Sequence, residues 1–351
     1  MIAFTGIGAV TPIGIGKEHF WHNLMKGYSG VKRTDRLLPS REIFCGEISG
    51  LNADKYIDDS RFRRAAVLSK YALIATQLAI DDANITKLPG KNTALVMGIT
   101  NGPLTYTQNF HRTLITEGVD ALSPSLFSES VLNAPASNIS ICFGIEGSVQ
   151  TLLGGRTTAL KALILAYQLM TLDECDKALI VCSEELNELS LSCYSRLGDT
   201  ILSEGAGAIL IEKLSGMEGP HPYCYLAGMA SYCNPSNPLE ALAEVIQKSL
   251  ETAGLEFGDI DFIVTDPFLA SLHDLYLNKI PCGCINPLTG NAFSAAAMWD
   301  IILSSLVLKY GVIPASVRTN NLIITDEIEH IMICSAEEKG VAAAIVLSKY
   351  V

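Results

Sequence analysis

Two stretches of this chain repeat one pattern, and that pattern decides the fold. The first reads KALIVCSEE at Lys177–Glu185 and continues, after a polar segment, with EGAGAILIEK at Glu204–Lys213. The second reads HIMICSAEE at His330–Glu338 and continues at once with KGVAAAIVLSK at Lys339–Lys349. Each is an apolar run, a polar turn and another apolar run, which predicts two adjacent buried strands. The chain is therefore expected to contain two copies of one α/β unit.

The segments upstream of each copy also correspond. Gly154-Gly155 leads into TTALKALILAYQL, and Gly290 leads into AFSAAAMWDIILSSLVL, two helices of small and apolar residues that can be buried on every side. Further upstream, SKYALIATQLAIDDA precedes TALVMGIT and LEALAEVIQKSLETA precedes DFIVTD, while AFTGIGAV matches YLAGMA. We expect duplicated α/β halves, residues 1–215 and 216–351, in five layers, α-β-α-β-α, with the small-residue helices in the centre.

The composition is consistent with two fused cores and excludes several classes of protein. A length of 351 residues exceeds what one hydrophobic core usually supports. No apolar run reaches the roughly 18 residues of a membrane span, and no signal peptide is visible, so a cytoplasmic protein is expected.

A net charge of −12 argues against nucleic acid as a partner. An acidic protein partner would be repelled overall and would need a local basic patch.

The ten cysteines do not predict disulfides or a metal site. Several of them, such as Cys182 and Cys334, lie inside apolar runs, where a reduced cysteine behaves as a small hydrophobic residue. Cys282 and Cys284 are separated by one residue and have no histidine cluster nearby, unlike a zinc site. We expect neither a metal nor a cofactor.

Several motifs, in order along essentially the whole chain, point to one family. They are TGIGAVTPIG and FWHNLMKGYSG within Met1–Gly30, GIEG at Gly144–Gly147, EGAGAIL at Glu204–Leu210 and Thr289-Gly290. With them the chain resembles the β-ketoacyl-carrier-protein synthases, which have the thiolase fold. The resemblance implies decarboxylative condensation by a Cys at the N-terminus of the first buried helix, where the helix dipole favours a thiolate. It also implies two His residues that stabilise the enolate, a supporting Lys and a Gly-Phe-Gly-Gly turn.

The same resemblance places other residue types at every catalytic position. Leu153, in the turn TLLGGR, stands where the nucleophilic Cys is expected, and leucine has no lone pair to attack a thioester. Asp266 corresponds to the first His, Asn286 to the Lys and Asn291 to the second His. The glycine-rich turn corresponds to Glu337–Gly340, which reads EEKG. No condensation by this chain alone is expected.

A retained fold with an erased site is typical of chain length factors, which pair with an active ketosynthase and shape the tunnel for the growing chain. The resemblance thus implies a heterodimer with an active ketosynthase, in which the strand Gly147–Leu152 pairs across the two-fold axis. The acyl carrier protein would be met mainly through that partner. Neither Leu152 nor Leu153 is the Gln of the actinomycete aromatic-polyketide type, so a polyene-forming system of the bacterial aryl polyene kind fits better.

Two alternatives remain open at this point. One is a divergent thiolase-fold acyltransferase that uses Ser148 or Thr151 as nucleophile, although the motif order places no His near either residue to activate it. The other is an acyl-binding protein that acts alone.

Two further groups of residues are candidates for contacts with partners. Arg61, Arg63 and Arg64 begin the predicted helix RFRRAAVLSKYAL, and they either dock an acidic carrier protein or make ordinary surface salt bridges. Tyr106, Phe110 and Leu114 lie at positions i, i+4 and i+8 of a predicted helix. They either gate a chain tunnel shared with the partner or pack into the core.

Overall fold

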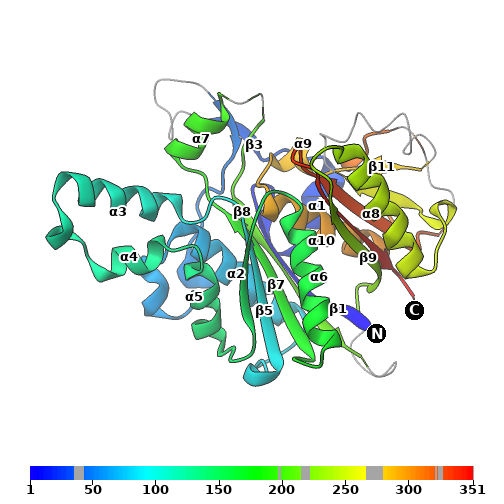
Figure 1. Ribbon diagram of the computed structural model, residues 1–351, viewed down its shortest axis with the longest axis horizontal. Helices are drawn as coiled ribbons and strands as arrows, with labels where there is room; N and C mark the ends of the chain where they lie inside the picture. The colour runs from blue at the N-terminus through cyan, green and yellow to red at the C-terminus, as the bar shows by residue number, and fades with distance from the viewer. Residues whose placement is uncertain are drawn as a thin grey trace.

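The two halves of the chain build the same five-stranded arrangement (Figure 1). In this computed structural model the described residues are 1–34, 43–196, 198, 200–214, 222–265, 280–320, 322 and 327–350. The first half contributes β1 (Ile2–Thr11), β5 (Thr93–Ile99), β6 (Val149–Leu153), β7 (Lys177–Glu184) and β8 (Gly205–Lys213). The second half contributes β9 (Tyr225–Cys233), β10 (Phe262–Thr265), β11 (Cys282–Gly283), β12 (His330–Ala336) and β13 (Val341–Ser348).

The strand order confirms the duplication. It runs β6-β5-β7-β8-β1 in the first half and β11-β10-β12-β13-β9 in the second, which is the order 3-2-4-5-1 within each half. The three strands farthest from the junction are parallel in each half, and the other pairings are antiparallel. The halves join through the pair Ala3 and Tyr225, so the ten strands form one continuous path among the described residues. The predicted boundary at 215/216 falls outside the described residues and stays a prediction.

Helices complete the five layers of a thiolase-like fold. Helix α2 (Val67–Asp82) covers β1, β7 and β8, and α8 (Pro238–Ala253) covers β9, β12 and β13. Between the two sets of strands lie α6 (Thr158–Thr171) and α10 (Ser294–Tyr310), which contact each other and strands of both halves. The remaining helices are α1 (Lys17–Lys26), α3 (Leu104–Thr116), α4 (Pro124–Ser130), α5 (Ala134–Phe143), α7 (Glu188–Tyr194) and α9 (Asn286–Thr289). The short strands are β2 (Gly14–Ile15), β3 (Val31–Thr34) and β4 (Ile43–Gly46).

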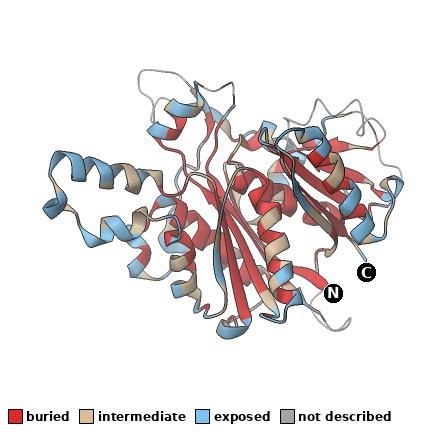
Figure 2. Cartoon of the chain, in the orientation of Figure 1, coloured by how far each residue is buried: buried red, intermediate tan, exposed pale blue. Residues whose placement is uncertain are grey.

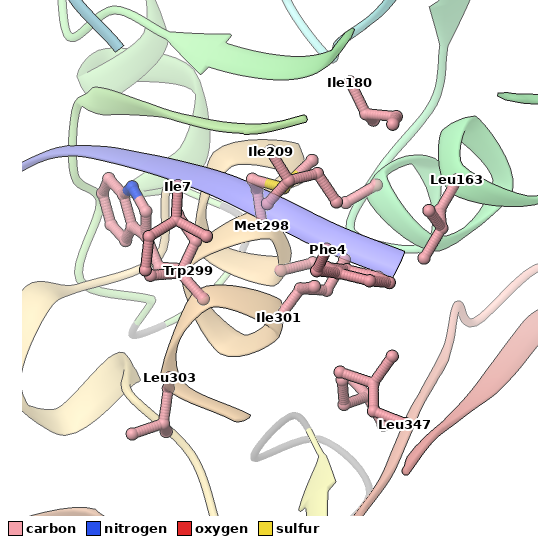
Figure 3. Packing of buried hydrophobic residues seen from close by; sticks show 14 of the residues in the cluster. Phe4, Ile7, Leu163, Ile180, Ile209, Met298, Trp299, Ile301, Leu303 and Leu347 are labelled. Carbon is pink, nitrogen blue, oxygen red and sulfur yellow. The ribbon is translucent and has the colours of Figure 1, made fainter. Parts of the chain in front are cut away.

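The central helices differ in how completely they are buried. Every residue of α10 from Ser294 to Leu308 is buried, as its small-residue composition predicted, and Figure 3 shows Met298, Trp299 and Ile301 among the packed apolar side chains. The Trp299 indole donates to the Ala206 carbonyl at 2.9 Å. Helix α6 is buried along one side, through residues such as Leu163. Its other side, which includes Leu165 and Leu169, is half-buried, so the expectation of complete burial is wrong for this helix.

Glycines in equivalent strands let the outer helices approach the sheet closely. A Cβ on Gly6 of β1 would lie 2.1 Å from the Ala79 carbonyl oxygen of α2. A Cβ on Gly228 of β9 would lie 2.1 Å from the Ser249 carbonyl oxygen of α8. Both contacts are too short for any side chain, which explains why both first strands carry a glycine facing their helix.

Candidate functional site

The turn between β6 and α6 carries the position predicted for the lost nucleophile. Leu153 is the last residue of β6, and its side chain is 51% exposed. Strand β6 pairs with β5 on one edge, and no described strand pairs with its other edge. Leu153 is therefore an exposed apolar residue at the end of a strand whose other edge is open among the described residues.

Arg156, three residues after Leu153, is buried and fully engaged. It forms an ion pair with Asp300 of α10, and its Nη1 donates to the Asn286 Oδ1 at 2.9 Å. The Asp300 Oδ1 also accepts from the Ile285 backbone N–H at 3.2 Å. Two positions that the sequence linked to lost catalytic residues, the turn and Asn286, are therefore joined by a satisfied polar network. We call Leu153–Thr157, Asn286, Asp300 and Glu337 together the turn site.

A carboxylate caps the helix that follows the turn. The Glu337 Oε1 accepts from the Thr157 backbone N–H at 3.2 Å and from the Thr157 hydroxyl. A Cβ on Gly155 would lie 2.9 Å from the same oxygen, so the glycine makes room for Glu337. The N-terminus of a helix attracts anions, and here the chain supplies its own. A second anion, such as a thiolate or an enolate, would be repelled.

Asn291 uses its side chain within its own turn. Its Oδ1 accepts from the Phe293 N–H at 2.9 Å, and its backbone N–H and carbonyl pair with Ile201 and Ser203. Phe293 has φ 47° and ψ −114°, a backbone conformation that costs a non-glycine residue about 1–3 kcal/mol. Its ring lies 4.9 Å from that of Tyr194. The start of α10 thus has a strained backbone conformation. The side chain at position 291 that supports it is an amide and has no ionisable group.

Two adjacent buried glutamates hold the loop that carries α3. Glu184 accepts from the Thr100 and Asn101 backbone N–H groups and from the Ser294 hydroxyl at 3.0 Å. Glu185 accepts from the Thr105 N–H at 2.7 Å, in the first turn of α3. Burial raises the pKa of Glu184 to about 7, although these hydrogen bonds act to lower it. These contacts fix the base of α3 relative to α10.

Tyr106, Phe110 and Leu114 lie on α3, which projects with α4 from the body of the molecule (Figures 1 and 2). No residue of either helix is buried, so the alternative that these three residues pack into the core is wrong. The Phe110 ring lies 5.8 Å from that of Phe127, which is 56% exposed. The two helices therefore present an apolar surface to solvent, and we call them the α3–α4 arm.

The three arginines lie on a separate turn before the helix that they were predicted to begin. Ser60–Arg64 is a 3₁₀ turn, and α2 starts at Val67 because Ala65 and Ala66 adopt extended backbone. The Arg61 guanidinium binds the Asp59 carboxylate, with its Nη2 2.6 Å from Oδ2, and the Arg63 Nε lies 3.9 Å from Asp54. Among the described residues the Arg64 guanidinium has no ion-pair partner, although its carbonyl accepts from the Tyr106 hydroxyl.

Asp266, the position predicted for the first catalytic His, lies outside the described residues. Within the described part of the chain, no group of three or more His, Cys, Asp or Glu side chains is arranged to hold a metal ion. None of its helices is long and apolar enough to cross a membrane.

Comparison with known proteins identifies the family. Residues 1–207 match the family model described as the N-terminal domain of β-ketoacyl synthases. The chain belongs to the β-ketoacyl synthase family. It is 24% identical to a Streptomyces halstedii protein named as a polyketide β-ketoacyl synthase 1, over 89% of this chain and 86% of that protein.

Solved structures of other β-ketoacyl synthases share the fold. A chain of the ishigamide ketosynthase/chain length factor superposes with a TM-score of 0.89 at 20% identity, covering 100% of this chain and 99% of that one. A chain from a type II polyketide synthase acyl-carrier protein in complex with its ketosynthase gives a TM-score of 0.82 at 19% identity. That match covers 99% of this chain and 98% of the other.

In this member of the β-ketoacyl synthase family, sequence reasoning missed Asp300 of the turn site, and it located Glu337 without its contact to Thr157. Asp300 is a charged residue within the otherwise uncharged stretch AAAMWDIILSS, and a buried acid in such a helix requires a partner. That signal was present in the sequence. The cap formed by Glu337 on Thr157 links residues 180 positions apart, and nothing in the local sequence indicates it.

Proposed function

We propose that this chain is a non-catalytic ketosynthase subunit, a chain length factor, which forms a heterodimer with an active β-ketoacyl synthase. The observation that carries the proposal is the turn site. Its helix N-terminus is occupied by Glu337, and its cation, Arg156, is bound by Asp300 and Asn286. A site that satisfies its own charges offers neither a nucleophile nor a free donor to a developing oxyanion.

The partner surface we propose is the open edge of β6 together with the neighbouring side of α5. Val149 and Leu153 of β6 are 37% and 51% exposed, and Ile141 of α5 is also exposed. An edge strand with apolar side chains favours pairing with another chain, because its free N–H and C=O groups and its apolar surface are both satisfied there. An obligate interface of this kind should bury more than roughly 2,000 Å² in total.

The α3–α4 arm would then contact the partner and limit the length of the growing chain. Of its apolar side chains, Leu114 and Phe127 are exposed, and Phe110, which packs against Phe127, is half-buried. Arg64, whose guanidinium has no described ion-pair partner, is the best placed of the three arginines to meet an acidic carrier protein. A polyene of the aryl polyene kind is the product class we propose, because the turn lacks the Gln of the aromatic-polyketide type.

Coexpression with candidate ketosynthases tests the proposal. We expect a stable heterodimer that extends malonyl and acyl carrier-protein thioesters, and no turnover by this chain when the ketosynthase is absent. Turnover by the chain alone would favour the divergent acyltransferase with Ser148 or Thr151 as nucleophile. A well-behaved monomer or homodimer that binds no ketosynthase would favour the solitary acyl-binding protein.

A pair of matched variants tests the partner surface. Val149→Arg places a charge on the β6 edge, and Leu239→Arg places one on the exposed face of α8. Burying an unpaired charge costs several kcal/mol, so the first variant should weaken the heterodimer by about a hundredfold or more. The second should leave its affinity within about threefold. Equal effects of the two variants would contradict the β6 interface.

A further inference from the structure

A cavity separate from the turn site lies against the first turns of α2. Its volume is about 610 Å³, within the range of roughly 300–1,000 Å³ that is typical of small-molecule sites. One wall is the segment that contains the 3₁₀ turns Ala53–Lys55 and Ser60–Arg64, and α2 forms another. Most of the lining side chains are apolar, among them Leu51, Ile57, Phe62 and Leu73.

Of the two cations that line this cavity, Arg63 and Lys70, only Lys70 has no ion-pair partner among the described residues. Asp59 is bound by Arg61, and Asp54 lies 3.9 Å from the Arg63 guanidinium, so these four charges balance. Lys70 of α2 also lines the cavity, is half-buried and has no ion-pair partner among the described residues. A partly desolvated ammonium beside an apolar wall favours binding of an anion, because charge-assisted hydrogen bonds are stronger away from bulk water.

We propose that this cavity is a binding site for an amphipathic carboxylate, with its hydrocarbon chain against the apolar wall and its carboxylate on Lys70. The cavity supplies apolar area for the chain, and Lys70 is the lining cation that is not paired with a carboxylate among the described residues. This inference does not depend on the proposed heterodimer, since neither β6 nor the α3–α4 arm lines the cavity.

Calorimetric titration of the full chain, free or in its purified complex, tests the site. The probes are decanoate, 1-decanol and inorganic phosphate. Decanoate should bind saturably, 1-decanol about tenfold more weakly because it lacks the charge, and phosphate without measurable heat because it lacks the chain. Lys70→Met should remove the preference for decanoate over 1-decanol, and Lys70→Arg should retain it. Lys91→Met, at an exposed lysine outside the cavity, should match the wild type.

Three results would overturn the proposal. These are no saturable decanoate binding to the wild type, equal affinities for decanoate and 1-decanol, or an unchanged preference in Lys70→Met. Val67→Trp provides a second measurement, since Val67 lines the cavity and a larger side chain there should weaken both ligands about equally.

Discussion

Arg156 and Asp300 form a buried ion pair between the turn that precedes α6 and the middle of α10, and so between the two halves of the chain. Asn286 and the Ile285 N–H satisfy further hydrogen-bonding positions of the pair. Two charges removed from water are tolerated only when they are paired and hydrogen-bonded in this way. The pair therefore has a structural role beside Leu153, the position at which we propose that the nucleophile has been lost.

Arg156→Ala should destabilise the protein by about 3–5 kcal/mol, because it leaves the Asp300 carboxylate buried without its cation. The measurement is the free energy of unfolding in urea, with Arg63→Ala as a control at an exposed arginine that should change it little. The double variant Arg156→Met with Asp300→Leu should regain most of the loss, because no buried charge remains. A single variant as stable as the wild type would contradict the structural role.

Leu153→Cys should not restore condensation. We propose that Asp266 and Asn291 stand at the family's two His positions, and each such His contributes on the order of 10² or more in rate. The Asn291 side chain accepts a hydrogen bond within its own turn. The introduced thiol should also lack the low pKa of a catalytic Cys, because Glu337 already occupies the N-terminus of α6.

Alkylation with iodoacetamide, followed by mass spectrometry of the peptide that contains residue 153, measures that thiol directly as a function of pH. The pH at which alkylation reaches half of its maximal rate, the midpoint, should not fall below about 8.5. Adding Glu337→Gln to Leu153→Cys should lower the midpoint, since a neutral amide no longer opposes the thiolate. An unchanged midpoint in the double variant would show that Glu337 does not control the electrostatics of the turn.

Glu184 should make the protein less stable as the pH rises toward neutrality. Its pKa is raised from 4.5 to about 7 by burial, so the folded state binds this proton more tightly than the unfolded state. That contribution is complete below about pH 4.5 and is lost as the pH rises through 7, a difference on the order of 3 kcal/mol. Unfolding free energies of the wild type and Glu184→Gln should therefore diverge between pH 5 and about 8.

The control for Glu184 is Glu188→Gln, at an exposed acid in the first turn of α7, which should follow the wild-type profile. Parallel profiles for the wild type and Glu184→Gln would exclude Glu184 as the titrating group.

The duplicated fold could be predicted from the sequence because its signals are local. Apolar runs of strand length, each followed by a polar turn, identify β7, β8, β12 and β13, and the glycines of β1 and β9 mark the close approach of α2 and α8. The start of α2 was predicted too early. The stretch RFRRAAVLSKYAL contains no Gly or Pro, so nothing in it indicates that Ala65 and Ala66 are extended. Composition also cannot distinguish the buried side of α6 from its half-buried side.

The turn site was predicted in part for a different reason. Motif order alone points to Leu153, Asn286 and Asn291, and that these are lost catalytic positions stays a prediction. The contacts of the turn site join segments distant in sequence, such as Glu337 with Thr157 and Arg156 with Asp300. Their geometry depends on the packing of α6 against α10, which no local pattern encodes.

Phe110→Ala in the reconstituted heterodimer should shift the product profile toward longer chains without abolishing synthesis. Phe110 lies on the exposed α3–α4 arm, where its ring contacts Phe127, so its removal opens space without unpacking the core. Phe110→Trp should shift the profile the other way, because a larger ring narrows the same passage. The measurement is mass spectrometry of the products, with Phe257→Ala, at a half-buried phenylalanine beside α8, as the matched control. If chain length stays constant in both Phe110 variants while the complex remains intact, Phe110 does not gate the tunnel. If Phe257→Ala shifts the profile equally, the effect reflects a general loss of packing.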